Sequence, residues 1–184
     1  LIWLTATQLN VQPETAVATR GDKSTAGFAP GDEVSILSWN VGYAGLGEES
    51  DFFMDGGKQT RAPSKAIVEK NMDCIVATVQ GMAADFTFLQ EIDAGPSTHA
   101  YGIEEAGRLR TETQLDSAHA LNYKCAFVPY PIPPIGRVNT GLMTLSTAPI
   151  ASAERIALPS PFKWPVSVAN LKRCLMPVYI DLEG

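Results

Sequence analysis

Two short hydrophobic runs, each ending in polar side chains, organise the first half of the chain. The first covers residues 34–39 and the second residues 85–90. Both are predicted to be β-strands, and the almost continuous apolar character of the second is typical of a strand that is covered on both faces. Between them, hydrophobic residues recur close to a helical period, which predicts a helix that begins near Pro63 and ends near Gly81. The apolar positions of that helix are Ala66, Ile67, Met72, Ile75, Val76, Val79 and Met82.

The rest of the pattern alternates predicted strands, loops and one more helix. A charged, Ala-containing segment predicts a helix over residues 103–121, with Ala106, Leu109, Leu115 and Ala118 on its apolar side. Glycines indicate a long loop over 43–61, and prolines exclude regular structure over 129–136. The remaining strands are predicted over 123–128, 141–146, 150–158 and 174–182, with a loop over 159–165. This order indicates the α/β class.

The first 33 residues have a different character. Residues 5–30 are rich in Thr, Ala, Gly and Pro and show no apolar period, so residues 1–33 are predicted to form an extended lead-in. The apolar run Leu1-Ile2-Trp3-Leu4 is far too short to span a bilayer, and we expect it to be the tail of an upstream membrane anchor. A linker within a larger cytoplasmic protein is the alternative.

The net charge and the cysteine content limit the functions that the chain can have. The chain has 14 Lys and Arg against 20 Asp and Glu, a net charge of −6, which argues against tight sequence-independent binding to DNA. A bound divalent cation can nevertheless supply local positive charge for a phosphate substrate. The three cysteines, Cys74, Cys125 and Cys174, show no metal-binding spacing and predict buried thiols rather than a disulfide framework.

Asn40 and Glu91 are the candidate site residues, because each ends one of the two hydrophobic runs. Amide and carboxylate oxygens are ligands that suit Mg²⁺ rather than zinc. Each residue also has a simpler interpretation. Glu91 could be a solvated strand end, and Asn40 a turn residue whose side chain bonds its own backbone two residues on.

The two motifs Ser38-Trp39-Asn40-Val41 and Phe88-Leu89-Gln90-Glu91-Ile92-Asp93, with the later run 141–150, resemble the endonuclease/exonuclease/phosphatase superfamily of deoxyribonuclease-I-like hydrolases. The resemblance implies a four-layer α/β sandwich, with residues 34–184 as the amino-terminal part of the domain. It implies that Glu91 binds Mg²⁺ or Mn²⁺ and that Asn40 contacts the scissile phosphate and helps to orient the metal. It also implies a basic residue that reaches the phosphate. Arg173 is the candidate, with Lys172 or a plain solvated charge pair as alternatives.

The later motifs of that superfamily do not occur in this sequence. No Gly-Asp pair is followed two residues on by Asn, and neither His99 nor His119 matches the catalytic histidine of the family. Tyr130 and Asn139 lie where relatives place a residue beside the catalytic centre, but no alignment assigns them. We therefore expect this chain to be the front half of the enzyme domain, supplying mainly one of two facing sheets. On its own it should be inactive, and either self-associated or poorly soluble.

The function expected from these residues is metal-dependent hydrolysis of a phosphoester. A non-catalytic binding or structural module that retains the fold is the alternative. The substrate could be nucleic acid, a phospholipid or an inositol phosphate, because nothing in the sequence chooses among them. The anchored lead-in and the resemblance favour an extracytoplasmic location, with a cytoplasmic one as the alternative.

Overall fold

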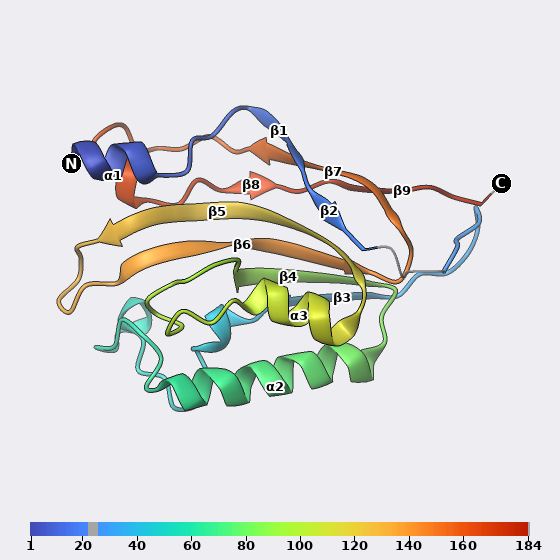
Figure 1. Cartoon of the computed structure of the whole chain (residues 1–184), viewed down its shortest axis with the longest axis horizontal. Coiled ribbons are helices and arrows are strands. Elements are labelled where there is room, and N and C mark those ends of the chain that lie inside the picture. The colour runs from blue at the N-terminus through green and yellow to red at the C-terminus, as the bar shows by residue number, and fades with distance from the viewer. Residues whose placement is uncertain (22–25, 184) are drawn as a thin grey trace.

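A computed structural model describes residues 1–21 and 26–183. Figure 1 shows helices α2 and α3 on one side of a sheet and a second sheet on its other side. The elements of the layered part are β3 (Ile36–Asn40), α2 (Lys65–Met82), β4 (Phe86–Asp93), α3 (Glu105–Thr113), β5 (Asp116–Val128), β6 (Gly136–Ser146) and β7 (Ile150–Ala157). The smaller elements are α1 (Ile2–Thr7), β1 (Glu14–Val17), β2 (Thr19–Arg20), β8 (Cys174–Leu175) and β9 (Val178–Ile180). This is the α/β class that the sequence predicts.

The larger sheet has the strand order β2-β5-β6-β4-β3, in which only β3 and β4 run parallel. The smaller sheet has the order β1-β7-β8, and β9 also pairs with β7. The chain therefore contributes strands to both sheets, which corrects the expectation that it supplies mainly one. The segment predicted as an extended lead-in provides α1, β1 and β2. These elements were not predicted, because the segment has no apolar period.

The main core lies between the larger sheet and its two helices. Val68, Met72, Ile75, Val76 and Val79 of α2 are buried there against residues of β4, β6 and α3. Burying this stripe provides most of the stability of an amphipathic helix. Two details of the predicted helix were wrong, because Ala66 and Met82 are exposed. The helix begins at Lys65, two residues after Pro63, and Ser64 caps it by accepting a hydrogen bond from the Ile67 amide.

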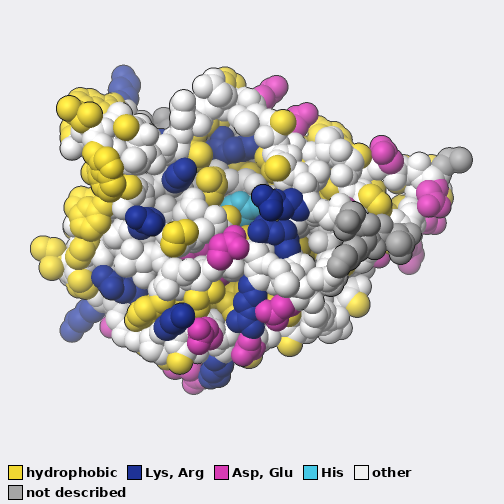
Figure 2. All heavy atoms as spheres, in the orientation of Figure 1, with side chains coloured by type: hydrophobic (Ala, Val, Ile, Leu, Met, Phe, Trp, Pro, Cys, Tyr) yellow, Lys and Arg dark blue, Asp and Glu magenta, His cyan; other side chains and the backbone are white. Residues whose placement is uncertain are grey.

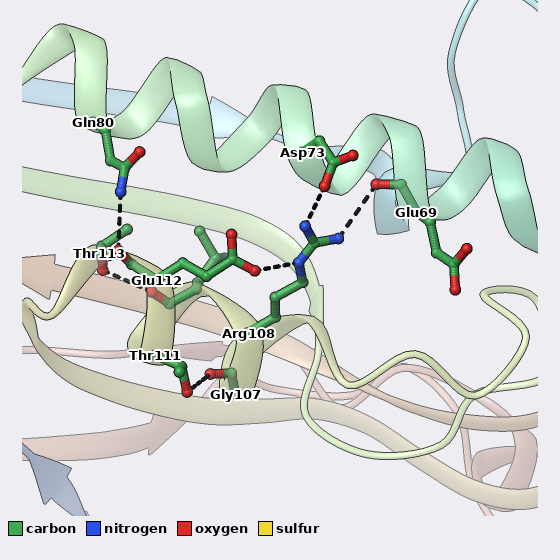
Figure 3. A network of polar contacts seen from close by, with 9 residues as sticks. Glu69, Asp73, Gln80, Gly107, Arg108, Thr111, Glu112 and Thr113 are labelled. Atoms are coloured by element: carbon green, nitrogen blue, oxygen red, sulfur yellow. Dashed lines mark hydrogen bonds and ion pairs between the residues drawn. The ribbon is translucent and has the colours of Figure 1, made fainter.

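Arg108 joins the two helices on the solvent side of the core (Figure 3). Its guanidinium contacts the carboxylates of Asp73 on α2 and Glu112 on α3, and donates to the Glu69 carbonyl. Gln80 of α2 donates a further hydrogen bond to the Glu112 carbonyl. Polar contacts thus fix α3 against α2 where the hydrophobic core ends.

The predicted helix over 103–121 was wrong beyond Thr113. Gln114 has a left-handed φ of 60°, which ends α3, and Asp116 already begins β5. Residues 116–121 pair with β6, so tertiary pairing overrides the helical tendency of their alanines. Among the smaller differences, β5 and β6 are longer than predicted, and residues 174–182 form two short strands separated by Met176-Pro177. Cys74 is exposed, whereas Cys125 and Cys174 are buried as predicted.

No helix among the described residues is both long and apolar enough to span a membrane.

Candidate active site

The carboxyl ends of β3 and β4 bring Asn40 and Glu91 together. The two strands are parallel, and Asn40 pairs in register with Gln90, the residue before Glu91. Because parallel strands end at the same edge of a sheet, the polar residues that follow both runs lie side by side. The local patterns that predicted the two strands thus also position the two candidate residues.

Glu91 occupies a β-bulge. On β6, Leu142 pairs with Gln90 and Gly141 pairs with Ile92, so Glu91 has no partner in the ladder. Its φ of 59° lies in the left-handed region, which a non-glycine residue adopts at a cost of about 1–3 kcal/mol. On the other side of β6, Gly141 allows a close approach to β5, because a Cβ there would come within 1.9 Å of the Ala120 carbonyl oxygen. Bulges of this kind re-aim a side chain, and this one directs Glu91 to the rim of a cavity.

Asn40, Glu91 and Arg173 line the same cavity, which has a volume of about 580 Å³. They also line a second hollow of about 260 Å³ together with Asn122 and Thr140. Arg173 immediately precedes β8 and is fixed there because its carbonyl accepts a hydrogen bond from the Leu158 amide. The cavity therefore combines a carboxylate, an amide and a guanidinium from three separate segments.

Lys172, the alternative to Arg173, does not line either hollow. Its ammonium donates hydrogen bonds to the Gln8 side chain and to the Leu9 carbonyl, at 2.5 and 2.7 Å. Burial lowers the pKa of this lysine. Lys172 thus ties the first residues of the chain to the segment before β8, and Arg173 is the basic residue that faces the cavity.

The amide of Asn40 has a structural role as well. Its Oδ1 accepts a hydrogen bond of 3.0 Å from the Gly42 amide, as expected for a turn-forming asparagine. This bond orients the side chain and occupies one of the two lone pairs on Oδ1. The Nδ2 group is a donor, which suits an anionic oxygen better than a cation.

Tyr43 is a cavity residue that sequence reasoning missed. It lies in the 3₁₀ turn Gly42–Ala44 with a left-handed φ of 56°. Its pKa is raised by burial, by the charges of Glu91, Asp93 and Glu105, and by a side-chain hydrogen bond to Glu91. The protonated hydroxyl donates this bond to the carboxylate. The glycine-rich run around Tyr43 marked a loop, but nothing in it indicated a contact with residue 91.

A buried polar cluster lies behind Tyr43. Its ring packs against the ring of His99, with centroids 4.6 Å apart. Nε2 of His99 lies 2.9 Å from Oδ2 of Asp93, an ion-pair distance without the alignment of a hydrogen bond. The backbone amide of Asp93 donates a 3.0 Å bond to Glu105, and both carboxylates are fully buried. The cluster supports the site from beneath, and His99 lines neither hollow that contains Glu91.

Three other residues that the sequence analysis compared with catalytic positions of the superfamily lie away from the cavity. Nε2 of His119 is 3.2 Å from the Ile92 carbonyl, and burial lowers the pKa of this histidine. Asn139 donates to the Ala94 carbonyl, and Tyr130 is exposed. None of the three lines the cavity.

The donor set fits a cation that keeps most of its water. Among residues 1–21 and 26–183 there is no group of three or more His, Cys, Asp or Glu side chains arranged to hold a metal ion. Mg²⁺ commonly binds through one or two carboxylates, with waters and substrate phosphates completing its shell. A single carboxylate at Glu91, held in an unusual backbone conformation at a cavity rim, is compatible with that mode.

Comparison with known proteins supports the fold. The chain is similar to the crystal structure of an endonuclease/exonuclease/phosphatase from Beutenbergia cavernae, with a TM-score of 0.54 and 22% sequence identity. The match covers 82% of this chain and 35% of that one, so this chain corresponds to about a third of the solved structure. No protein-family model matches the sequence, and no curated protein matches it either.

Proposed function

We propose that this chain forms part of a phosphoester hydrolase that uses Mg²⁺ or Mn²⁺, with Asn40, Glu91 and Arg173 in its active site. The observation that carries the proposal is the convergence of these three side chains on one cavity. A carboxylate, a neutral donor and a guanidinium together match the needs of a metal-bound phosphate. The similarity in fold to an endonuclease/exonuclease/phosphatase supports the same function.

Each residue has a distinct role in this proposal. Glu91 would hold the cation, which when bound neutralises phosphate charge and stabilises the charge that develops in the transition state. Asn40, oriented by its bond to Gly42, donates from Nδ2 to a phosphate oxygen. Arg173 is suited to bind two phosphate oxygens at once. Tyr43 is a positioning residue, because its hydrogen bond restrains the Glu91 carboxylate.

A non-catalytic module that binds phosphoesters is the second candidate. It is favoured by the single carboxylate at the candidate metal site, since the described residues supply no larger ligand group. Both candidates require binding at this cavity, but only the first requires turnover. A substrate that is bound in a metal-dependent way and never cleaved by the full-length protein would favour the module.

The substrate class and location are also proposals. Nucleic acid, a phospholipid and an inositol phosphate all present the phosphoester that these residues would bind. The net charge of −6 favours a small or lipid substrate over long duplex DNA. An extracytoplasmic, membrane-anchored setting is compatible with each of them. Assaying the full-length protein against a panel of these substrates would identify the class that it hydrolyses.

The test compares Glu91→Gln with a matched control, Glu33→Gln, which makes the same change at an exposed position away from the cavity. The assay follows hydrolysis of bis(p-nitrophenyl) phosphate by the full-length protein with Mg²⁺, with Mn²⁺ and with EDTA. We expect Glu91→Gln to lower kcat/KM by about 100-fold or more, which corresponds to about 2.7 kcal/mol of transition-state stabilisation. The control should retain wild-type activity. Full activity in EDTA, or in Glu91→Gln, would refute the assignment.

A further inference from the structure

Three segments far apart in the sequence meet at one end of the molecule. They are residues 1–13, 123–140 and 158–173, and we call this surface the apolar end. Each segment packs on one small cluster of Tyr123, Cys125, Val128 and Val138, through the partly buried residues Leu4, Ile135 and Ala169. In addition, the indole of Trp164 donates a 3.3 Å hydrogen bond to the Thr5 hydroxyl. The three segments therefore pack together into one continuous surface.

Large hydrophobic side chains on the apolar end point into solvent. Ile132 is 94% exposed, Ile2 89% and Tyr130 73%. The others that are at least two-fifths exposed are Leu1, Trp3, Phe127, Phe162, Trp164 and Val166. Figure 2 shows hydrophobic side chains gathered along the edge where α1 lies in Figure 1, with Lys and Arg side chains beside them. Scattered exposed hydrophobic residues need no explanation, but a contiguous group of this size indicates an interaction surface.

The charge of the apolar end is opposite to that of the whole protein. The three segments contain no Asp or Glu, in a chain that has 20 acidic and 14 basic residues. Of their five basic residues, Lys172 is bonded to Gln8 and Leu9 and Arg173 lines the cavity, which leaves three exposed cations for this surface: Lys124, Arg137 and Lys163. Lys163 lies directly between the exposed aromatic residues Phe162 and Trp164. The surface is therefore both hydrophobic and cationic.

We propose that the apolar end docks on the surface of an anionic lipid bilayer. Trp and Tyr favour the interface between water and hydrocarbon, and exposed aliphatic residues such as Ile132 gain by entering the acyl region. Lys and Arg beside them are attracted to anionic headgroups. A second copy of the chain fits less well, because two cationic surfaces would face one another. Docking of this surface does not depend on the proposed hydrolase activity.

The experiment measures binding of the protein to sedimented vesicles. Large unilamellar vesicles of phosphatidylcholine and phosphatidylglycerol at 3:1 are compared with pure phosphatidylcholine vesicles. We expect the protein to bind the anionic vesicles more tightly, and to bind them more weakly in 0.5 M NaCl because salt screens the attraction. Ile132→Ser should lower the affinity about tenfold or more, since it removes a hydrophobic side chain that enters the bilayer.

Met82→Ser is the matched control. Met82 is 61% exposed at the end of α2, outside the apolar end, so this variant should bind as the wild type does. Far-ultraviolet circular dichroism of both variants establishes that they are folded. Equal affinity for neutral and anionic vesicles, or an equal loss of binding in both variants, would overturn the proposal. So would a dimer that Ile132→Ser dissociates, with no binding to vesicles, because the apolar end would then be an interface between two copies.

Discussion

The buried carboxyl group of Glu105 should make the stability of this protein fall as the pH rises. Glu105 is fully buried, and one carboxylate oxygen accepts a 3.0 Å hydrogen bond from the Asp93 amide. Its other oxygen has no hydrogen-bond partner among the described residues. Burial, followed by the negative charge of Asp93, raises the pKa of Glu105 well above that of an ordinary glutamate. The folded protein thus keeps a proton on Glu105 under conditions in which the unfolded chain releases it.

The sign and the size of the effect follow from proton linkage. Below the ordinary glutamate pKa of about 4.3, Glu105 is protonated in both states and its full contribution to stability is present. Above that value the folded state binds one more proton than the unfolded state. The free energy of unfolding then falls by about 1.4 kcal/mol for each pH unit, until the pH passes the raised pKa of the folded state.

Glu105→Gln removes this titration and keeps the shape of the side chain, including an oxygen that can accept from Asp93. Urea unfolding of both proteins at pH 5, 6, 7 and 8 measures the difference. Between the ordinary glutamate pKa and the raised pKa of folded Glu105, we expect the free energy of unfolding of the variant, relative to that of the wild type, to rise by up to about 1.4 kcal/mol for each pH unit. Glu104→Gln is the control, because Glu104 is the neighbouring residue but its side chain is 47% exposed. A difference between wild type and Glu105→Gln that does not change with pH would refute the reasoning.

Two further predictions concern stability. Ser64→Ala should cost about 1 kcal/mol because it removes the cap of α2, whereas Ser64→Gly should cost only a few tenths, and equal losses in urea unfolding would contradict the capping role. Arg108→Met should lower stability by up to about 1 kcal/mol in low salt, or about 2–4 °C in Tm, because it breaks the contacts with Asp73 and Glu112. The loss should shrink in 1 M NaCl, and an unchanged loss would show that packing rather than charge holds α3 on α2.

Strands β3 and β4 and helix α2 could be predicted because local patterns specify them. A hydrophobic run that ends in a polar residue marks both a strand and the edge of a sheet, so the sequence pattern, together with the family resemblance, makes Asn40 and Glu91 candidate site residues. Helix α2 is long, and its hydrophobic stripe recurs over its whole length. In such segments the same hydrophobic side chains set the period of the helix or strand and form its buried face. One pattern therefore predicts both the type of element and the face that it buries.

The remaining features depend on partners that are distant along the chain. Residues 116–121 have the composition of a helix and become a strand because β6 offers a paired edge. The bulge at Glu91 exists only in the pairing of β4 with β6, and the contact between Tyr43 and Glu91 joins a loop to a strand almost fifty residues later. Arg173 and Lys172 are adjacent and chemically similar, so only the hydrogen bonds of Lys172 to Gln8 and Leu9 separate their roles. A long and regular local pattern specifies its own helix or strand, whereas the pairing of distant segments determines the other elements and which side chains meet in the cavity.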